Sequence, residues 1–268
     1  MCRKQICCAY NDSGAAAFNF IQPLLRRGVD IIHLVHFVQA SKDVPFGQKL
    51  LESFLPDDIF LDVKREVVVR ISQEGGVVGM KSDIEEHARR INATLIVLGT
   101  NALGSVNPKT GSLTYNFMSR GLACSTLFIN EEHGLEEDDE IRVSTAVTYT
   151  STAMMDFVCQ LFRPSRDTVT VIRCSKEGGS SDDSVMLGRY QEMGINKGMR
   201  CTGRLIFGKP SIALPEFVTQ MKSEILVVPA PAGTGMSPGM KRIFMNNKCP
   251  LLMFKDECKK KVEDEDSS

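Results

Sequence analysis

The segment from Gly99 to Ser112 has the composition of a loop that binds an anion. It contains three glycines, a single cation, Lys109, and no acidic residue. Backbone N–H groups in such a loop can face a phosphate without repulsion from a neighbouring carboxylate. The loop follows the apolar run LIVL, typical of a strand buried on both faces, and precedes SLTYNFMSRG, which indicates a short helix capped by Ser112. The pattern predicts a strand, a phosphate-binding loop and a helix in succession.

Polar residues also follow the first predicted strand, Gln5–Tyr10. Asn11, Asp12 and Ser13 stand between this strand and an apolar-faced segment that indicates a helix. Their side chains can cap the first helical turn or contact a ligand, and Asp12 is the residue to consider as a catalytic base. No G-x-S-x-G, H-E-x-x-H or complete P-loop motif accompanies them, so we predict no catalytic residue.

Strand-like and helix-like patterns alternate along the first half of the chain. The predicted strands are Gln5–Tyr10, Asp30–Val38, Glu66–Ile71, Leu95–Leu98 and Cys124–Ile129. The predicted helices before the loop are Ser13–Arg27, Phe46–Phe54 and Ser82–Asn92, the last with a capping box made by Ser82 and Glu85. Such alternation implies a mainly parallel sheet with helices on both faces. In a strand order of 3-2-1-4-5, the loops after strands one and four meet where the winding reverses, which is where such sheets bind ligands.

The same plan is predicted to occur twice. The strand-like runs that begin at Asp30, Leu95 and Cys124 have partners beginning at Asp167, Ile225 and Cys249, respectively 137, 130 and 125 residues later. This interval is the size of one domain rather than of a solenoid repeat. We therefore predict a first domain over 1–130, an acidic linker over 131–140, a second domain over 141–255 and a charged, disordered tail over 256–268.

Composition narrows the class of protein. The chain is 43% apolar and 24% charged, with a net charge of −1, which is typical of a globular protein and gives no general attraction to nucleic acid or to a membrane surface. No secretory signal and no run of eighteen apolar residues are present, so a cytoplasmic location is expected. The nine cysteines form no C-x-x-C pair and are expected to be reduced core residues. The histidines lack metal-ligand spacing, so no metal site is expected beyond Mg²⁺ accompanying a nucleotide.

Several of these motifs together resemble the universal stress protein family. They are the N-D-S after strand one, V-H-F-V, EVVVR, LIVLGT and a glycine-serine pair, and the similarity covers roughly residues 5–130, and 141–255 more weakly. The resemblance implies two tandem Rossmann-like domains of the adenine nucleotide alpha hydrolase type, each an α/β unit with a five-stranded sheet of order 3-2-1-4-5. Nucleotide-binding members carry G-x-x-G, a spacer, and G-S or G-T. Gly99 matches the first glycine, and Gly111-Ser112 matches the final pair. Ala102 occupies the position of the second glycine, and the spacer is one residue short. Gly104 can take the place of the second glycine only if the loop shifts.

The resemblance also implies roles for individual residues. Asn11 stands where the family often has a nucleoside-contacting aspartate, with Asp12 beside it, and adenine contacts fall on main-chain atoms near Phe37. Phosphate contacts fall on the loop and the start of the following helix. The candidate cofactor is ATP or AMP, and the candidate nucleotide-binding residues are Asn11, Asp12, Phe37, Leu98, Gly99, Ala102, Gly104, Gly111, Ser112 and Leu113.

The second copy departs from the nucleotide-binding pattern. Pro229 stands where the first copy has Gly99, and Pro231 and Pro238 follow, each without a backbone N–H donor. We therefore expect a degenerate second domain that pairs with the first as a pseudo-dimer, although two chains can also associate through the edges at Cys124–Ile129 or Cys249–Phe254. The expected function is a regulatory module that binds an adenine nucleotide. The alternatives are a nucleotide-free dimerisation or interaction module and, with least support, an ATP hydrolase or adenylyl-transfer enzyme.

Overall fold

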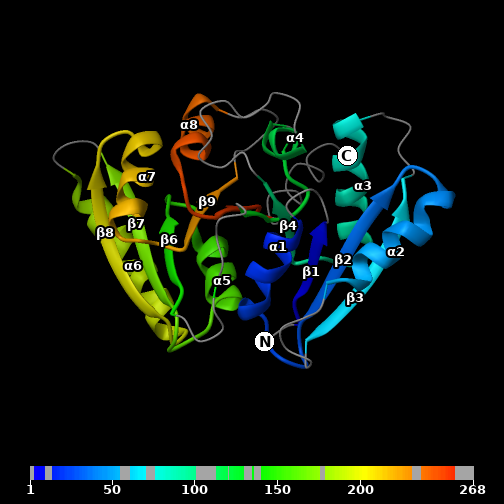
Figure 1. Ribbon diagram of the computed structural model, residues 1–268. Helices are drawn as coiled ribbons and strands as arrows, with labels where there is room; N and C mark the ends of the chain where they lie inside the picture. Colours follow the sequence, from blue (N-terminus) through cyan, green and yellow to red (C-terminus); the bar gives the residue numbers. More distant parts are fainter. Residues whose placement is uncertain are drawn as a thin grey trace, which may run out of the picture.

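The chain alternates strands and helices along its whole described length (Figure 1). The computed structural model describes residues 3–9, 14–54, 61–70, 76–100, 113–119, 121–129, 135, 140–175, 179–230 and 237–256. The predicted linker, apart from residues 135 and 140, and the predicted tail, apart from Asp256, lie outside the described residues. Within the described ranges, no helix has both the length and the apolar character needed to cross a bilayer.

Nine main elements precede the predicted linker and nine follow it, in the same order of types. The first set comprises β1 (Gln5–Ala9), α1 (Gly14–Ile21), β2 (Ile31–Val38), α2 (Val44–Glu52), β3 (Asp62–Val69), α3 (Gly76–Arg90), β4 (Leu95–Gly99), α4 (Leu113–Ser119) and β5 (Thr126–Ile129). The second set comprises β6 (Arg142–Ala146), α5 (Thr152–Leu161), β7 (Thr168–Ser175), α6 (Ser181–Asn196), β8 (Arg200–Phe207), α7 (Pro210–Gln220), β9 (Ile225–Pro229), α8 (Pro238–Asn246) and β10 (Leu251–Phe254). Short 3-10 turns, η1 (Gln22–Leu24) and η2 (Ser41–Asp43), follow α1 and precede α2.

All ten strands of the described residues belong to one sheet, in the order β3-β2-β1-β4-β5-β10-β9-β6-β7-β8 (Figure 1). Each half therefore has the predicted order 3-2-1-4-5, but the two expected sheets are continuous. They join where β5 and β10 pair antiparallel, with Leu127 opposite Leu252. Both strands are wholly buried and, apart from Thr126, apolar, so pairing satisfies backbone groups that would otherwise form exposed edges.

Two helical layers cover the sheet. Buried residues of α1, α2, α5 and α6 form one core with one face of the strands. Buried residues of α3, α4, α7 and α8 form a second core on the opposite face. The continuous apolar patterns of β4 and β9 follow from this arrangement, because a strand covered by helices on both sides has no solvent face.

Several predicted boundaries are wrong; the helix predicted over Ser13–Arg27, for example, ends at Ile21. The strand predicted at Glu66–Ile71 runs instead from Asp62 to Val69, because β2 pairs with eight residues that include charged ones tolerated on the outer edge of the sheet. The helix predicted from Ser82 begins at Gly76, so Ser82 lies inside it and forms no capping box. Glu85 instead accepts hydrogen bonds from Lys81 Nζ at 2.8 Å and from the backbone N–H of Ala123 at 3.1 Å.

A buried aspartate precedes β2 and organises the start of the first half. Asp30 is fully buried and accepts hydrogen bonds from the backbone N–H groups of Lys4 and Arg26, both at 2.9 Å. The Arg26 guanidinium lies 2.7 Å from the same carboxylate. Burial alone opposes ionisation, but the guanidinium and the two backbone donors hold the pKa of Asp30 below its ordinary value.

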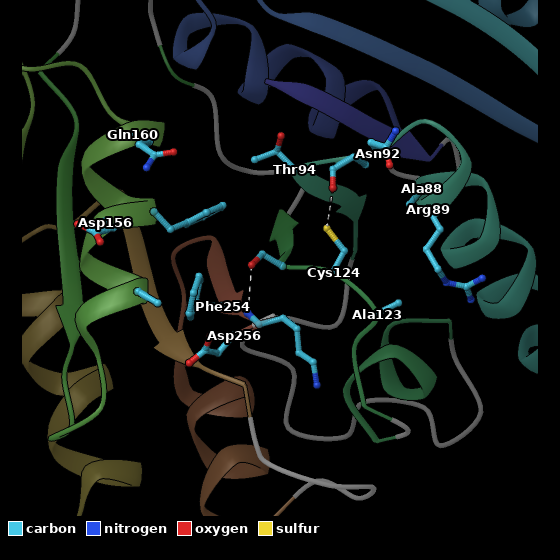
Figure 2. A pocket seen from close by; sticks show the side chains of 15 residues that line it. Ala88, Arg89, Asn92, Thr94, Ala123, Cys124, Asp156, Gln160, Phe254 and Asp256 are labelled. Atoms are coloured by element: carbon cyan, nitrogen blue, oxygen red, sulfur yellow. Dashed lines mark hydrogen bonds between the residues drawn. The ribbon is translucent and has the colours of Figure 1, made fainter. Parts of the chain in front are cut away.

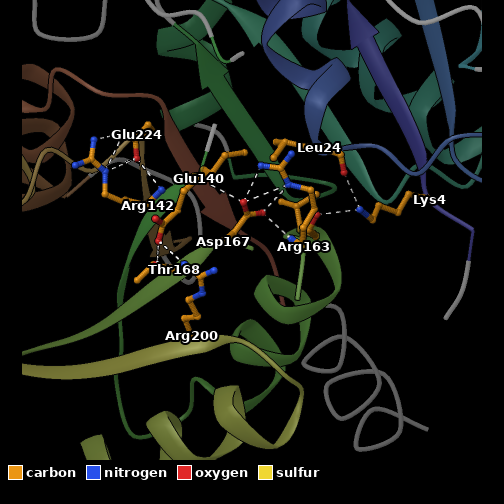
Figure 3. Close-up of polar contacts among 11 residues, drawn as sticks. Lys4, Leu24, Glu140, Arg142, Arg163, Asp167, Thr168, Arg200 and Glu224 are labelled. Atoms are coloured by element: carbon orange, nitrogen blue, oxygen red, sulfur yellow. Dashed lines mark hydrogen bonds and ion pairs between the residues drawn. The ribbon is translucent and has the colours of Figure 1, made fainter. Parts of the chain in front are cut away.

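The second half repeats this network at positions 137 residues later. Asp167, also fully buried, accepts from the backbone N–H groups of Ile141 at 3.2 Å and Arg163 at 2.7 Å, and the Arg163 guanidinium lies 2.7 Å from it (Figure 3). Identical bonding from corresponding main-chain and side-chain groups shows that the two halves share one architecture.

Lys4 breaks the symmetry and connects the halves. Its ammonium donates to the carbonyls of Leu24 at 3.2 Å and Leu161 at 2.9 Å, which are themselves 137 residues apart, and it lies 3.7 Å from Asp30 (Figure 3). The corresponding residue of the second half is the apolar Ile141. Lys4 is 6% exposed, and burial lowers its pKa to about 8.

Candidate functional site

The predicted site lies at the carboxyl edge of β1, β2 and β4. Among its residues the structure describes Phe37 near the end of β2, Leu98 and Gly99 at the end of β4, and Leu113 at the start of α4. β1 lies between β2 and β4, so these positions surround the point where the strand order reverses. The other candidates, Asn11, Asp12, Ala102, Gly104, Gly111 and Ser112, lie outside the described residues.

Two of the described candidates offer main-chain atoms rather than side chains. Phe37 is 7% exposed and Leu98 is 1% exposed, and both belong to the core beneath α3 and α4. Phe37 lies two residues beyond Val35, the last residue of β2 that pairs with β1 in the described part of the chain. The backbone at Phe37 lies one residue before the carboxyl end of β2, at the edge of the sheet where a ligand would lie.

A threonine pair connects β4 to α4. Thr100 follows the last residue of β4, and its backbone N–H donates to the carbonyl of Ile129 at 2.7 Å. The Thr114 hydroxyl donates to the Thr100 hydroxyl at 2.9 Å, and both side chains are buried. This bond fixes the two ends of the predicted phosphate-binding loop relative to each other. Sequence reasoning missed the pair, although Thr100 follows Gly99 directly in the LIVLGT run.

Neutral imidazoles lie beneath and beside Phe37. The ring of His87, from α3, packs edge-on against Phe37 with centroids 6.1 Å apart. Burial lowers the pKa of His87, against the opposing effect of Glu66, and burial also lowers the pKa of His36 on β2. Both histidines are therefore neutral at pH 7, so they bring no positive charge to the position predicted to contact adenine.

The corresponding edge of the second half has an exposed aromatic side chain. Tyr149, after β6, is 59% exposed, and the Arg173 guanidinium lies 4.9 Å from its ring centroid. Arg173 donates to Asp183 at 2.7 Å, and the pKa of Asp183 is lowered to about 2 by hydrogen bonds from Ser175 and Arg173. An arginine-tyrosine stack thus stands where the first half has His36 and Asp12, 137 residues earlier.

A buried tyrosine fixes the same loop. Tyr190 of α6 accepts a hydrogen bond from the backbone N–H of Ser151 at 2.9 Å and donates to the carbonyl of Thr148 at 2.9 Å. Pro229 ends β9 and occupies the position that corresponds to Gly99. The two halves therefore share strand order but differ in the residues that surround the crevice.

Comparison with solved structures identifies the fold. A universal stress protein from Archaeoglobus fulgidus DSM 4304 superposes with a TM-score of 0.67 at 12% identity, covering 94% of this chain and 96% of that one. A provisionally assigned universal stress protein from Pseudomonas aeruginosa UCBPP-PA14 gives a TM-score of 0.57 at 13% identity, covering 99% and 98%. A functionally unknown protein from Pseudomonas aeruginosa PAO1 gives 0.55 at 12% identity, covering 96% and 94%. No family model and no curated protein matches by sequence. The chain thus has the fold of these proteins over nearly its whole length.

Proposed function

We propose that this chain is a tandem universal stress protein-like regulatory module whose first half binds an adenine nucleotide, ATP or AMP. The observation that carries the proposal is the position of the Thr100–Thr114 bond, beside the central strand where the strand order reverses. The segment between these threonines is the glycine-containing, acid-free loop, whose composition suits phosphate. The described fold therefore puts both ends of this loop at the edge where parallel sheets bind nucleotides.

In this proposal, main-chain atoms near Phe37 and Leu98 contact adenine, with the neutral imidazole of His87 beneath the Phe37 ring. Asn11 and Asp12 contact the ribose. Gly99, Gly111, Ser112 and Leu113 contact phosphate, and Mg²⁺ accompanies the nucleotide. The proposed module binds and senses the nucleotide; at most, weak hydrolysis accompanies binding.

Calorimetric titration of the purified chain with ATP and AMP tests the proposal. Binding is expected at millimolar nucleotide or below. Gly111→Asp is expected to weaken it at least about tenfold, because a carboxylate within hydrogen-bond reach of a phosphate costs more than about 1.4 kcal/mol.

Ser237→Asp is the matched control. Ser237 caps α8 by accepting from the backbone N–H of Met240 at 3.1 Å, a role that aspartate also fills. The control adds the same charge at the start of the corresponding helix of the second half and is expected to leave nucleotide binding unchanged. If the unmodified protein binds neither nucleotide at millimolar concentration, the proposal is wrong.

A specific observation favours a second candidate, a nucleotide-free interaction module. Pro229 removes a donor from the second half, and Ala102 departs from the glycine pattern in the first. This candidate predicts no nucleotide in the native protein. Mass spectrometry of small molecules released from the purified chain separates the two functions, because a retained adenine nucleotide is expected only in the first.

A further inference from the structure

A cavity lies at the junction of the two halves, remote from the proposed nucleotide site. Its walls come from the end of α3, the residues before β4 and β5, α5, and the end of β10 (Figure 2). Its volume is about 540 Å³, within the range of small-molecule sites, which also occur preferentially between domains. The cavity lies at the amino end of β4, whereas Gly99 lies at its carboxyl end. A five-residue strand spans about 16 Å, so one ligand does not reach both places.

An aromatic wall lines one side of this junction cavity. The rings of Phe157 on α5 and Phe254 on β10 lie 5.4 Å apart at an interplanar angle of 50°. Phe254 is 9% exposed and Phe157 is half-buried, so part of the wall is open to a ligand. Four alanines complete the apolar lining without filling the space: Ala88, Ala93, Ala123 and Ala153. Such a surface suits a flat, apolar ring.

Two hydroxyl groups of the cavity can donate to a ligand. Thr94 and Ser125 already use their hydroxyl oxygens to accept from the backbone N–H groups of Gln5 at 3.3 Å and Lys255 at 3.0 Å. Each hydroxyl proton remains available to donate to a ligand. Ile96 pairs with Thr126, so Thr94 and Ser125 lie at the starts of neighbouring strands. In Figure 2 the amide of Gln160 extends from α5 toward the cavity.

The cavity is lined by two cations, Arg89 and Lys255, and by two acids, Asp156 and Asp256, which differ in how they are paired. Lys255 is half-buried, and within the described ranges neither it nor Arg89 has an acidic partner. Asp156, by contrast, is paired with Lys197 at 2.6 Å, and Asp256 is the other acid of the lining. A smaller adjoining cavity shares Thr94, Phe157 and Gln160, and its basic residues Arg3, Lys4 and Arg26 are already paired with Asp62 and Asp30. One half-buried ammonium and two hydroxyls suit a singly charged carboxylate better than a doubly charged phosphate.

We propose that the junction cavity binds a small aromatic carboxylate. Its ring packs against Phe157 and Phe254, and its carboxylate accepts hydrogen bonds from Thr94, Ser125 and the Lys255 ammonium. The site takes its aromatic wall from the second half and its hydroxyl donors from the first, so it exists only in the joined molecule.

The test is calorimetric titration of the full chain with 2-naphthoate, with naphthalene-2-carboxamide as a neutral probe of the same shape. We expect naphthoate to bind with a Kd of about 1 mM or tighter, and the carboxamide to bind at least about tenfold more weakly, because it lacks the charge that Lys255 would pair with. Saturating ATP is expected to leave naphthoate binding unchanged, since the two places are separate. Tighter binding of 2-naphthyl phosphate would overturn the assignment of a carboxylate.

Three variants locate the site. Lys255→Met and Ser125→Ala are each expected to weaken naphthoate binding about fivefold to tenfold. Lys49→Met removes an exposed lysine on α2, away from the cavity, and is expected to change nothing. Thermal unfolding checks that each variant folds. If Ser125→Ala does not fold, the result for Lys255→Met decides the test. Failure of naphthoate to bind at 10 mM (about 3 kcal/mol of affinity), or equal binding by Lys255→Met, would overturn the proposal.

Discussion

Replacing Lys4 with methionine is expected to change how stability depends on pH. Lys4 donates to two carbonyls from different halves and is almost fully buried. Burial lowers its pKa from 10.5 to about 8. Methionine has a similar length and no charge, so the variant removes the titration while keeping most of the packing. All other titrating groups are common to both proteins and cancel in the difference.

The sign and size of the effect follow from linkage. Below pH 8 the ammonium is protonated in both the folded and unfolded states, and the folded state bears the full cost of burying it. Between pH 8 and 10.5 the unfolded chain binds more protons than the folded one, so stability rises with pH. At 1.36 kcal/mol for each pKa unit, the complete gain is about 3 kcal/mol. A neutral amine still has two N–H donors, so both carbonyl bonds to Lys4 persist after deprotonation.

Urea unfolding monitored by circular dichroism at several pH values between 7 and 10.5 measures this difference. The free energy of unfolding of the unmodified protein should rise relative to that of Lys4→Met by about 2 kcal/mol or more across the interval. A difference that stays constant within about 0.5 kcal/mol would refute the reasoning, because the buried amine would then titrate at its ordinary value. A difference that falls with pH would also refute it, because the pKa of Lys4 would then be raised in the folded state.

Three further substitutions test the repeated architecture and the second-half loop by the same unfolding measurement. Asp30→Asn and Asp167→Asn should each cost about 3–5 kcal/mol, because each leaves a guanidinium without its buried partner; costs that differ by more than about 2 kcal/mol would contradict equivalent networks. Tyr190→Phe should cost about 1–3 kcal/mol, because it removes the 2.9 Å acceptor of the Ser151 N–H, leaving that group only the Thr148 carbonyl at 3.3 Å, and it also removes the donor to the same carbonyl. A cost below about 0.5 kcal/mol would show that water replaces the hydroxyl.

Local pattern predicted the central part of the fold. The runs at Leu95–Leu98 and Ile225–Val228 are apolar at every position, so their burial on both faces does not depend on register. The start of the outer strand β3 was harder to predict, because its first residues include charged ones and form a strand only by pairing with β2. The start of α3 was missed for a similar reason: Ser82 and Glu85 fit a cap locally, but Glu85 bonds to Lys81 and to the distant Ala123.

The candidate sites also contain residues that could be placed from local sequence patterns and contacts that could not. Gly99 and Leu113 could be placed at the ends of β4 and α4 from sequence, because glycine and helix signals act over a few residues. The Thr100–Thr114 bond depends on how the intervening chain returns, which no short pattern encodes. The junction cavity could not be predicted from the sequence, because Thr94 and Phe254 come from different halves and neither belongs to a recognisable motif.

The antiparallel pairing of β5 with β10 has a consequence for how the halves can change independently. The strands run in opposite directions where the halves meet, yet the sheet twists between them, so that the arrows of β1, β2, β6 and β8 all point upward in Figure 1. Pro229 at the end of β9 is separated from Gly99 at the end of β4 by two strands, β5 and β10. The halves remain connected through the shared sheet, through packing such as that of Phe244 on α8 against Phe128 on β5, and through the buried lysine between Leu24 and Leu161. The residues at the strand ends can therefore diverge between the halves while the junction that joins them is kept.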